Sequence, residues 1–362
     1  MNSSTRAKAR FRQICTLGPG GLGCIPDLLA AVRDVVPSGP NAFLVVDQDQ
    51  RCEYLTVEDC PDSVMETFRS EFGGAMQPDI DNITRFFALC QTGAYFGFEE
   101  RASPGFYGRG LYHEAWRPLG QHHSMAGVVQ LDGRLRGLMQ LYRGSKEPAF
   151  SGQEARELGW LLPFVPRVLQ ASLSQGLLRV AVTRTGFVLL DRSGRVSHAC
   201  ENSKRMLGNL RLEYSWNNRQ VEIDNGLADL ATRLERIADG RPASPPEVRF
   251  GYSGGEVRFR AHGLQQALEG AEHVILATVE QREWDSLCLL RGLRTLPLSS
   301  RESDVCFWLS QGMTTALVAD RMGLKPSTVK AYADSVYAKL GVSSREDLRA
   351  RIMSGSLGDG PS

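Results

Sequence analysis

The strongest constraint on this 362-residue chain is a series of helix start and stop signals between residues 298 and 352. Ser299 followed three residues later by Glu302 forms a capping box, in which each side chain satisfies a backbone donor at a helix N-terminus. Ser343 with Glu346 has the same spacing and predicts the start of a later helix. Together with the apolar residues between them, these signals predict four short helices.

The third of these helices begins near Pro326 and has two different faces. Val329, Val336 and Leu340 recur at helical spacing and form an apolar stripe. The opposite face carries short, hydrogen-bonding or basic residues, namely Ser327, Thr328, Lys330, Ala331 and Asp334. A helix with such a face can enter the major groove of DNA and present side chains to base edges. We therefore expect these five residues to face the groove.

Positive charge gathers in the same region. Ten Lys or Arg and six Asp or Glu lie between Arg291 and Arg351, a net charge of +4, whereas the whole chain carries +1. Such a concentration is typical of a surface that meets phosphates, and we expect phosphate contacts from Arg301, Thr315 and Lys339. The pattern alone leaves two alternatives open: a helical capping domain with a solvated face, and a scaffold whose terminal helices only dimerise.

The segment resembles the LuxR-type helix-turn-helix (HTH) domain, which is shared with the NarL/FixJ response regulators. The matching residues are Leu298-Ser299, Arg301-Glu302, Gly312, Val318-Ala319, Thr328-Val329-Lys330, Lys339-Leu340-Gly341-Val342 and Arg345. The sequence departs from the family pattern at Thr315-Ala316-Leu317, Lys325 and Tyr332. The resemblance implies a transcriptional regulator that binds double-stranded DNA as a homodimer, with the fourth helix contributing to the dimer contact. RNA polymerase is a further partner that such a regulator would have.

Length and composition limit the remaining possibilities. With 42% hydrophobic residues the chain can bury two or three cores. It has no apolar run of 18 residues, so no membrane span is expected, and its basic N-terminus lacks the apolar stretch of a signal peptide. The eight cysteines are scattered without a Cys-x-x-Cys pair, which favours free thiols in a reducing cytoplasm over a disulfide frame or structural zinc.

Ahead of the C-terminal segment, residues 21–176 are expected to form a first sensor domain, after a flexible tail over residues 1–20. Asp132-Gly133 between two alternating apolar runs predicts a β-hairpin, and a long helix bent by Pro163 and Pro166 is expected to follow it. The order of helices and hairpins resembles a GAF-like domain. The resemblance implies that a small-molecule ligand binds there.

Residues 180–282 are expected to form a second domain. A hairpin over residues 186–196 and a short helix from Glu201 that ends at Gly208 resemble the opening of a PAS domain. Residues 283–296 are predicted to be a connecting helix with an apolar side that could pair with a second subunit, formed by Leu287, Leu289, Leu290 and Leu293. The expected fold class is thus α+β multidomain: antiparallel-sheet GAF-like and PAS-like sensor domains followed by an all-α four-helix LuxR-type HTH domain at 297–356.

One motif supports a different function. Gly18, Gly20 and Gly23 fit G-x-G-x-x-G after a possible strand at 14–17, and Asp47 ends the next apolar run, as in a dinucleotide-binding unit. However, the following helix is expected to start near Pro26, and the chain after Asp47 turns into an antiparallel hairpin instead of a crossover. A nucleotide-cofactor-dependent enzyme therefore remains only the alternative, and we expect neither a catalytic site nor a cofactor.

Two further clusters have an ordinary explanation beside a functional one. His113, His122 and His123 could hold a metal with Cys90 or Glu114, but adjacent residues on a strand point to opposite faces, so solvated or core histidines are favoured. The aromatic residues between 95 and 107, with Trp116, could line a ligand pocket or form ordinary core, and the latter is favoured.

Overall fold

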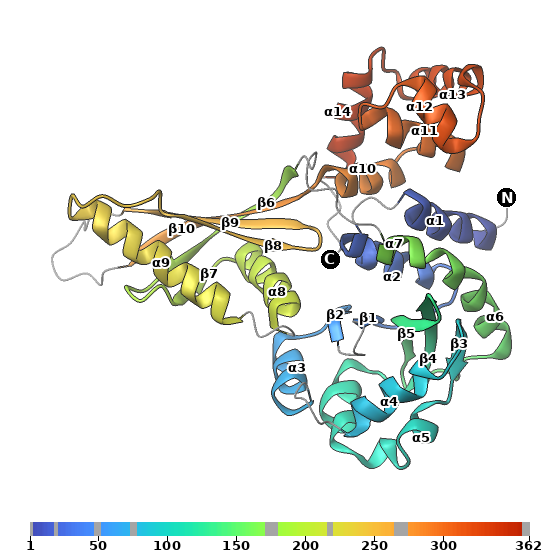
Figure 1. Cartoon of the computed structure of the whole chain (residues 1–362), viewed down its shortest axis with the longest axis horizontal. Helices are drawn as coiled ribbons and strands as arrows, with labels where there is room; N and C mark the ends of the chain where they lie inside the picture. Colours follow the sequence, from blue (N-terminus) through green and yellow to red (C-terminus); the bar gives the residue numbers. More distant parts are fainter. Residues whose placement is uncertain are drawn as a thin grey trace.

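The computed structural model describes residues 3–17, 21–46, 52–72, 78–170, 180–215, 220–263 and 274–356. Figure 1 shows three lobes: a first lobe (residues 3–170), a second lobe (180–284) and a C-terminal lobe (285–356). Within the described ranges, none of the helices combines the length and apolar character needed to cross a membrane.

The first lobe is built on a five-stranded antiparallel sheet with the order β2-β1-β5-β4-β3. Its strands are β1 Ala42–Val46, β2 Cys52–Val57, β3 Gly93–Phe96, β4 His123–Leu131 and β5 Arg134–Arg143. The predicted β4–β5 hairpin is confirmed, because Asp132 and Gly133 both have positive φ, at 52° and 74°, as a tight two-residue turn requires. The expected antiparallel pairing of β1 with β2 is also confirmed.

Helices cover both faces of this sheet (Figure 1). Buried residues of one face belong to a core shared with α1 Ser3–Leu17, α2 Ile25–Arg33, α6 Gly152–Leu161 and α7 Pro166–Gln170, with short 3-10 turns η1 Gly21–Cys24 and η6 Leu162–Phe164. The other face packs on α4 Pro78–Ala88, α5 Glu99–Ala102 and the short turns η2 Phe68–Phe72, η3 Phe106–Gly108 and η4 Tyr112–Trp116. Helix α3 Asp62–Thr67 lies against η2 and η4, and η5 Arg117–Leu119 follows η4. The expected bend of the long helix is present, since η6 separates α6 from α7 at the prolines.

The N-terminal expectation was wrong in two respects. Residues 3–17 do not form a flexible tail but the helix α1, and residues 14–17 are therefore not a strand. Phe11, Ile14 and Cys15 on α1 are at most 1% exposed, because they pack into the core that joins the first lobe to the C-terminal lobe. The apolar residues of this face are widely spaced in a basic, polar stretch, so the sequence pattern did not indicate a helix.

The second lobe carries another five-stranded antiparallel sheet, in the order β7-β6-β10-β9-β8. Its strands are β6 Val180–Leu190, β7 Val196–Ala199, β8 Glu247–Tyr252, β9 Gly255–His262 and β10 Ile275–Trp284. Its helices are α8 Glu201–Ser215 and α9 Gln220–Ala238. The helix expected to end at Gly208 continues past it to Ser215, so the glycine is not a C-cap.

The C-terminal lobe contains α10 Asp285–Arg294, α11 Ser300–Ser310, α12 Thr315–Met322, α13 Pro326–Leu340 and α14 Arg345–Ser356. The capping box of Ser299 and Glu302 is confirmed. The second box is shifted by one residue, since the Asp347 N–H donates to Ser344 Oγ over 3.0 Å. Two five-stranded sheets followed by a helical lobe confirm the α+β class.

The apolar side of α10 was expected to pair with a second subunit, but it packs within the chain. Leu287, Leu289, Leu290 and Leu293 are all at most 5% exposed and belong to the core between the first and C-terminal lobes. Since that side is buried within the chain, a second subunit would need another surface.

Candidate nucleic-acid interface

Helix α13 is anchored by its apolar stripe. Val329 and Val336 are fully buried, and Leu340 packs against the same core. Pro326 occupies the first turn, where no intrahelical N–H bond is lost. The packing of this stripe decides which side chains of α13 point outward.

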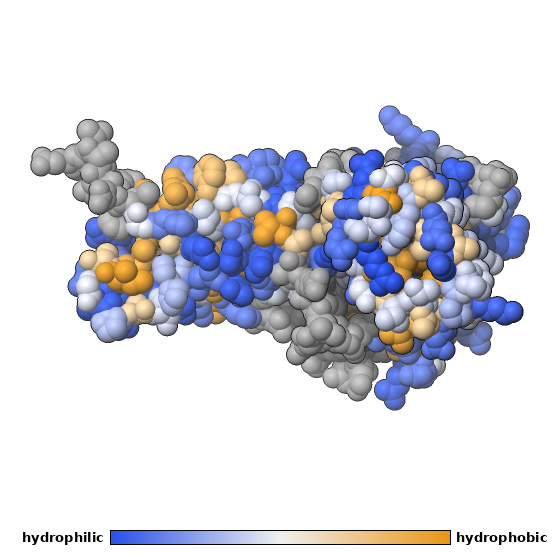
Figure 2. Space-filling model, turned by 90° about the horizontal axis from the view of Figure 1, so that it is seen from above, coloured by the Kyte–Doolittle hydropathy of each residue, from blue (hydrophilic) through white to orange (hydrophobic). Residues whose placement is uncertain are grey.

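The opposite face of α13 is open. Ser327, Lys330, Ala331 and Asp334 are exposed, and Thr328 is half-buried at the same end. Within the described part of the chain, no ion pair or hydrogen bond engages the Lys330 ammonium. All five predicted groove-facing residues thus lie on one helix, and none is packed into the core. Figure 2 looks onto the C-terminal lobe at the right and shows a largely hydrophilic surface with small hydrophobic spots.

A buried carboxylate fixes the position of α13 on α11. Glu302, 4% exposed, accepts from the Lys339 ammonium at 2.6 and 2.8 Å and from the Ser335 hydroxyl at 2.9 Å. The Lys339 ammonium, together with the cap at Ser299, lowers the pKa of Glu302 to about 2. Lys339 was expected to reach phosphate; in the structure it is ion-paired with Glu302, where it holds α13 on α11.

The other expected phosphate contacts lie at helix starts. Arg301 is exposed in the first turn of α11. Thr315, half-buried at the start of α12, accepts a long 3.5 Å hydrogen bond from Arg345, whose other nitrogen donates to the Met313 carbonyl. The first turns of α11 and α12 therefore carry a cationic and a hydroxyl group.

Sequence reasoning missed one cation. The Arg321 guanidinium lies 4.0 Å from the centroid of the Trp308 ring, a cation–π contact between α12 and α11. Arg321 is exposed and Trp308 is nearly buried, so the ring holds the charge at the surface. No local pattern connects the two residues, because they lie in different helices. Leu317, one of the residues at which the sequence departs from the family pattern, is 56% exposed on α12.

The glycine motif is not built like a dinucleotide site. Gly18, Gly20 and Asp47 lie outside the described residues. The described glycine, Gly23, is buried in η1, where a Cβ atom would lie 2.6 Å from the Ser253 carbonyl oxygen of the second lobe. Residues 14–17, which precede the glycines, lie in the helix α1 instead of a strand, and β1 pairs with β2 in an antiparallel hairpin, so the described residues do not form the strand–turn–helix unit of such a site.

The aromatic cluster of the first lobe is closely packed. Phe106 meets Trp116 and Tyr112 edge to face, at ring-centroid distances of 4.7 and 6.0 Å, and all three are at least 92% buried. The Tyr112 hydroxyl lies 2.7 Å from His122 Nδ1, while burial and the neighbouring His123 lower the pKa of His122. Among the described residues, no three His, Cys, Asp or Glu side chains gather in a way that could hold a metal ion.

Comparison with known proteins assigns a family to the C-terminal segment. No curated protein sequence matches the chain. The structure of Escherichia coli SdiA matches over 92% of this chain and 89% of its own, with 9% identity and a TM-score of 0.27. A structure of SdiA in complex with octanoyl-rac-glycerol covers 98% and 89%, with 9% identity and a TM-score of 0.25. TM-scores this low do not establish a shared fold. Residues 296–351, however, match the model for bacterial regulatory proteins of the luxR family, so α11–α14 form a helix-turn-helix domain of that family.

Proposed function

We propose that the chain is a cytoplasmic transcriptional regulator that binds double-stranded DNA as a homodimer, with α13 in the major groove. The observation that carries the proposal is the open face of α13, where Lys330 is exposed between small polar neighbours. A major groove admits a helix of this kind, and Lys can donate to the O6 and N7 acceptors of guanine. Arg301 and Thr315 would hold the flanking phosphates.

The two sheet-containing lobes are proposed to be the sensory part, the first GAF-like and the second PAS-like. Their sheets have the same strand order, which supports a common sensor architecture. A small molecule bound in the first lobe would shift the equilibrium between different arrangements of the two C-terminal lobes of the dimer. RNA polymerase would be the partner that responds to this change. The enzyme alternative is not favoured, because the glycines follow the helix α1 instead of a strand and β1 leads into an antiparallel hairpin.

The proposal is tested by selecting DNA sequences with the purified full-length chain and titrating the selected duplex by fluorescence anisotropy. If Lys330 contacts a base edge, Lys330→Ala should weaken specific binding by about 1–3 kcal/mol and relax the preference at one position. Lys204→Ala removes the same charge from an exposed position on α8 and serves as the matched control. Its affinity should remain at the wild-type value.

Two outcomes would contradict the proposal. One is that the chain recovers no enriched sequence and shows no dependence of affinity on salt, since phosphate contacts make binding fall steeply with ionic strength. The other is that Lys330→Ala and Lys204→Ala behave alike. A parallel titration of the full chain with nicotinamide and flavin nucleotides, followed by fluorescence, separates the enzyme alternative, because the regulator should bind none of them.

A further inference from the structure

The three lobes meet at the start of α2. Gly23, just before this helix, lies against the turn at Ser253-Gly254 in the second lobe and against Leu287 of α10. The Trp284 indole N–H donates to the Ser253 carbonyl at 3.0 Å, so the same turn is also fixed to the residue that precedes α10. Such close backbone approach leaves little room for movement between these elements unless the junction opens.

A buried ion cluster lies beside this contact. Asp27, in the first turn of α2, is 5% exposed and accepts from Arg291 Nε at 3.1 Å and from an Arg294 terminal nitrogen at 2.7 Å. Arg291 also donates to both oxygens of Glu283 on β10, at 2.9 Å each. The cluster therefore joins one residue of the first lobe, one of the second and two of the C-terminal lobe.

The charges of this cluster balance only when all three lobes are in contact. Two guanidinium groups face two carboxylates, and Asp27 is the carboxylate supplied by the first lobe. Burial raises the pKa of Asp27, and the Arg291 guanidinium opposes this shift. Without Asp27, Arg291 would keep Glu283, and Arg294, one third exposed, would turn to water. Without Asp27, two guanidinium groups would therefore share one carboxylate, and α10 would lose its ion pairs to α2.

Helix α10 is packed against α11 and α14 of the C-terminal lobe. Asp285 at its start is ion-paired with Arg349 of α14, and its leucines belong to the core that includes α11 and α14. A second, polar contact between the lobes lies further along, where Gln13 of α1 donates to Asp304 of α11 at 2.6 Å. Whatever holds α10 on α2 therefore sets the orientation of the whole C-terminal lobe.

This docking does not cover the recognition helix. The open face of α13 stays exposed while α11 contacts α1 and α10 is ion-paired with α2. The contact is thus suited to orienting the C-terminal lobe, not to blocking it. For a dimer that reads two half-sites, a fixed orientation favours one half-site spacing over others, because the recognition helices are already in register.

We propose that Asp27 is the positioning residue through which the first lobe fixes the orientation of the DNA-binding lobe, by its ion pairs to Arg291 and Arg294 of α10. The inference rests on the proposed function for its effect on DNA, but the junction itself is independent of DNA. Loss of Asp27 should loosen the contact of α10 with α2, while the apolar core that the first and C-terminal lobes share stays in place.

The first experiment measures amide hydrogen exchange of the full chain without DNA, comparing wild type with Asp27→Asn and the milder Arg294→Gln. Exchange in α2 and α10 should rise by about tenfold in Asp27→Asn and by a smaller factor in Arg294→Gln, while β4, β5 and α13 keep their protection. Asp34→Asn is the matched control, since Asp34 lies at the other end of α2 and pairs with Arg10 inside the first lobe. It should leave α10 unchanged.

Unchanged exchange of α10 in both junction variants would overturn the proposal, as would an equal rise in Asp34→Asn. If Asp27→Asn loses its circular dichroism and does not fold, Arg294→Gln decides by the same criterion. Because no DNA is present, this result does not depend on whether the proposed function is correct.

The second experiment uses the selected operator with its half-sites moved apart by about 5 base pairs, half a helical turn, which places them on opposite sides of the duplex. Wild type should lose about tenfold or more in affinity, and Asp27→Asn should discriminate less than about threefold between the two spacings. Equal discrimination by both proteins would contradict the positioning role. Failure of wild type to bind either duplex would instead count against the proposed function.

Discussion

The two sheets of this chain have the same topology but meet their surroundings differently. Renumbered from its own first strand, the second sheet also reads 2-1-5-4-3, and all its neighbouring strands are antiparallel. The first sheet is buried on both faces, with Met139 facing one core and Leu138 the other. Among the described residues, the second sheet is covered on one face, by α8 and α9, where Val257 and Phe259 lie in its core. Strand order therefore does not decide how many faces are covered.

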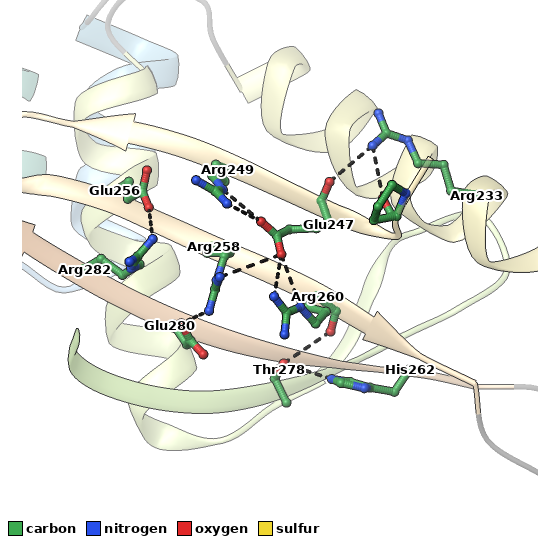
Figure 3. Close-up of polar contacts among 11 residues, drawn as sticks. Arg233, Glu247, Arg249, Glu256, Arg258, Arg260, His262, Thr278, Glu280 and Arg282 are labelled. Atoms are coloured by element: carbon green, nitrogen blue, oxygen red, sulfur yellow. Dashed lines mark hydrogen bonds and ion pairs between the residues drawn. The ribbon is translucent and has the colours of Figure 1, made fainter. Parts of the chain in front are cut away.

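The outer face of the second sheet replaces apolar packing with paired charges (Figure 3). Three opposite-charge pairs lie directly across from each other on neighbouring strands: Glu247 with Arg260, Arg258 with Glu280, and Glu256 with Arg282. Glu247 also accepts from Arg249 at 2.7 Å. Cross-strand pairs of this kind add about 0.2–1 kcal/mol each, so this face is stabilised without a covering layer.

The largest effect is expected from a charge placed in the core between the first sheet and α4. Leu138→Arg places a cation where the side chain is 1% exposed within an apolar core, and it should destabilise the first lobe by about 4 kcal/mol or more. Phe187→Arg is the matched change in the second sheet, where the side chain is 53% exposed, and it should cost less than about 0.5 kcal/mol. Local unfolding free energies from amide exchange of β5 and β6 measure both, and similar costs would refute the contrast between the sheets.

A change on the covered face of the second sheet comes next. Phe259→Ala removes a fully buried ring that meets Phe250 edge to face at 5.8 Å, and it should cost about 3–5 kcal/mol. Arg260→Ala on the adjacent, outward position should cost about 1 kcal/mol or less, because its guanidinium is half exposed. Urea unfolding monitored by exchange of β9 amides gives both values. A larger loss from Arg260→Ala would mean that the two faces had been assigned the wrong way round.

The smallest effect concerns the charge network and depends on pH. Hydrogen bonds from Arg260 and Arg249 lower the pKa of Glu247, so its contribution to stability is present above the unfolded pKa of about 4.3 and is lost as the pH falls through the folded value. Glu247→Gln should therefore cost about 0.5–1 kcal/mol at pH 7 and nothing once the pH lies below the folded pKa. Exchange of β8 at both pH values checks this. A difference that persists in acid would show that packing, not charge, explains it.

Much of the C-terminal lobe could be predicted from the sequence because its signals are local. Ser299 and Glu302 cap α11 within one turn, and the periodic valines of α13 determine that Lys330 faces outward. The hairpin at Asp132-Gly133 was equally local. The α+β class and the antiparallel pairing of both sheets followed from alternating runs and turn residues in the same way.

What the sequence by itself determined about this protein is therefore most of its helices after α1, its hairpins and its outward faces, since these depend on residues within a few positions of one another. Only the tertiary structure decided where those faces meet. Asp27 and Arg291 are 264 residues apart, Glu302 engages Lys339 across two helices, and α1 is a helix whose apolar side completes a core with α11. The leucines of α10 followed the helical period correctly, yet no period states whether such a side faces a second subunit or the chain's own first lobe. Contacts between distant segments depend on how whole surfaces fit together, and that information is not contained in any local pattern.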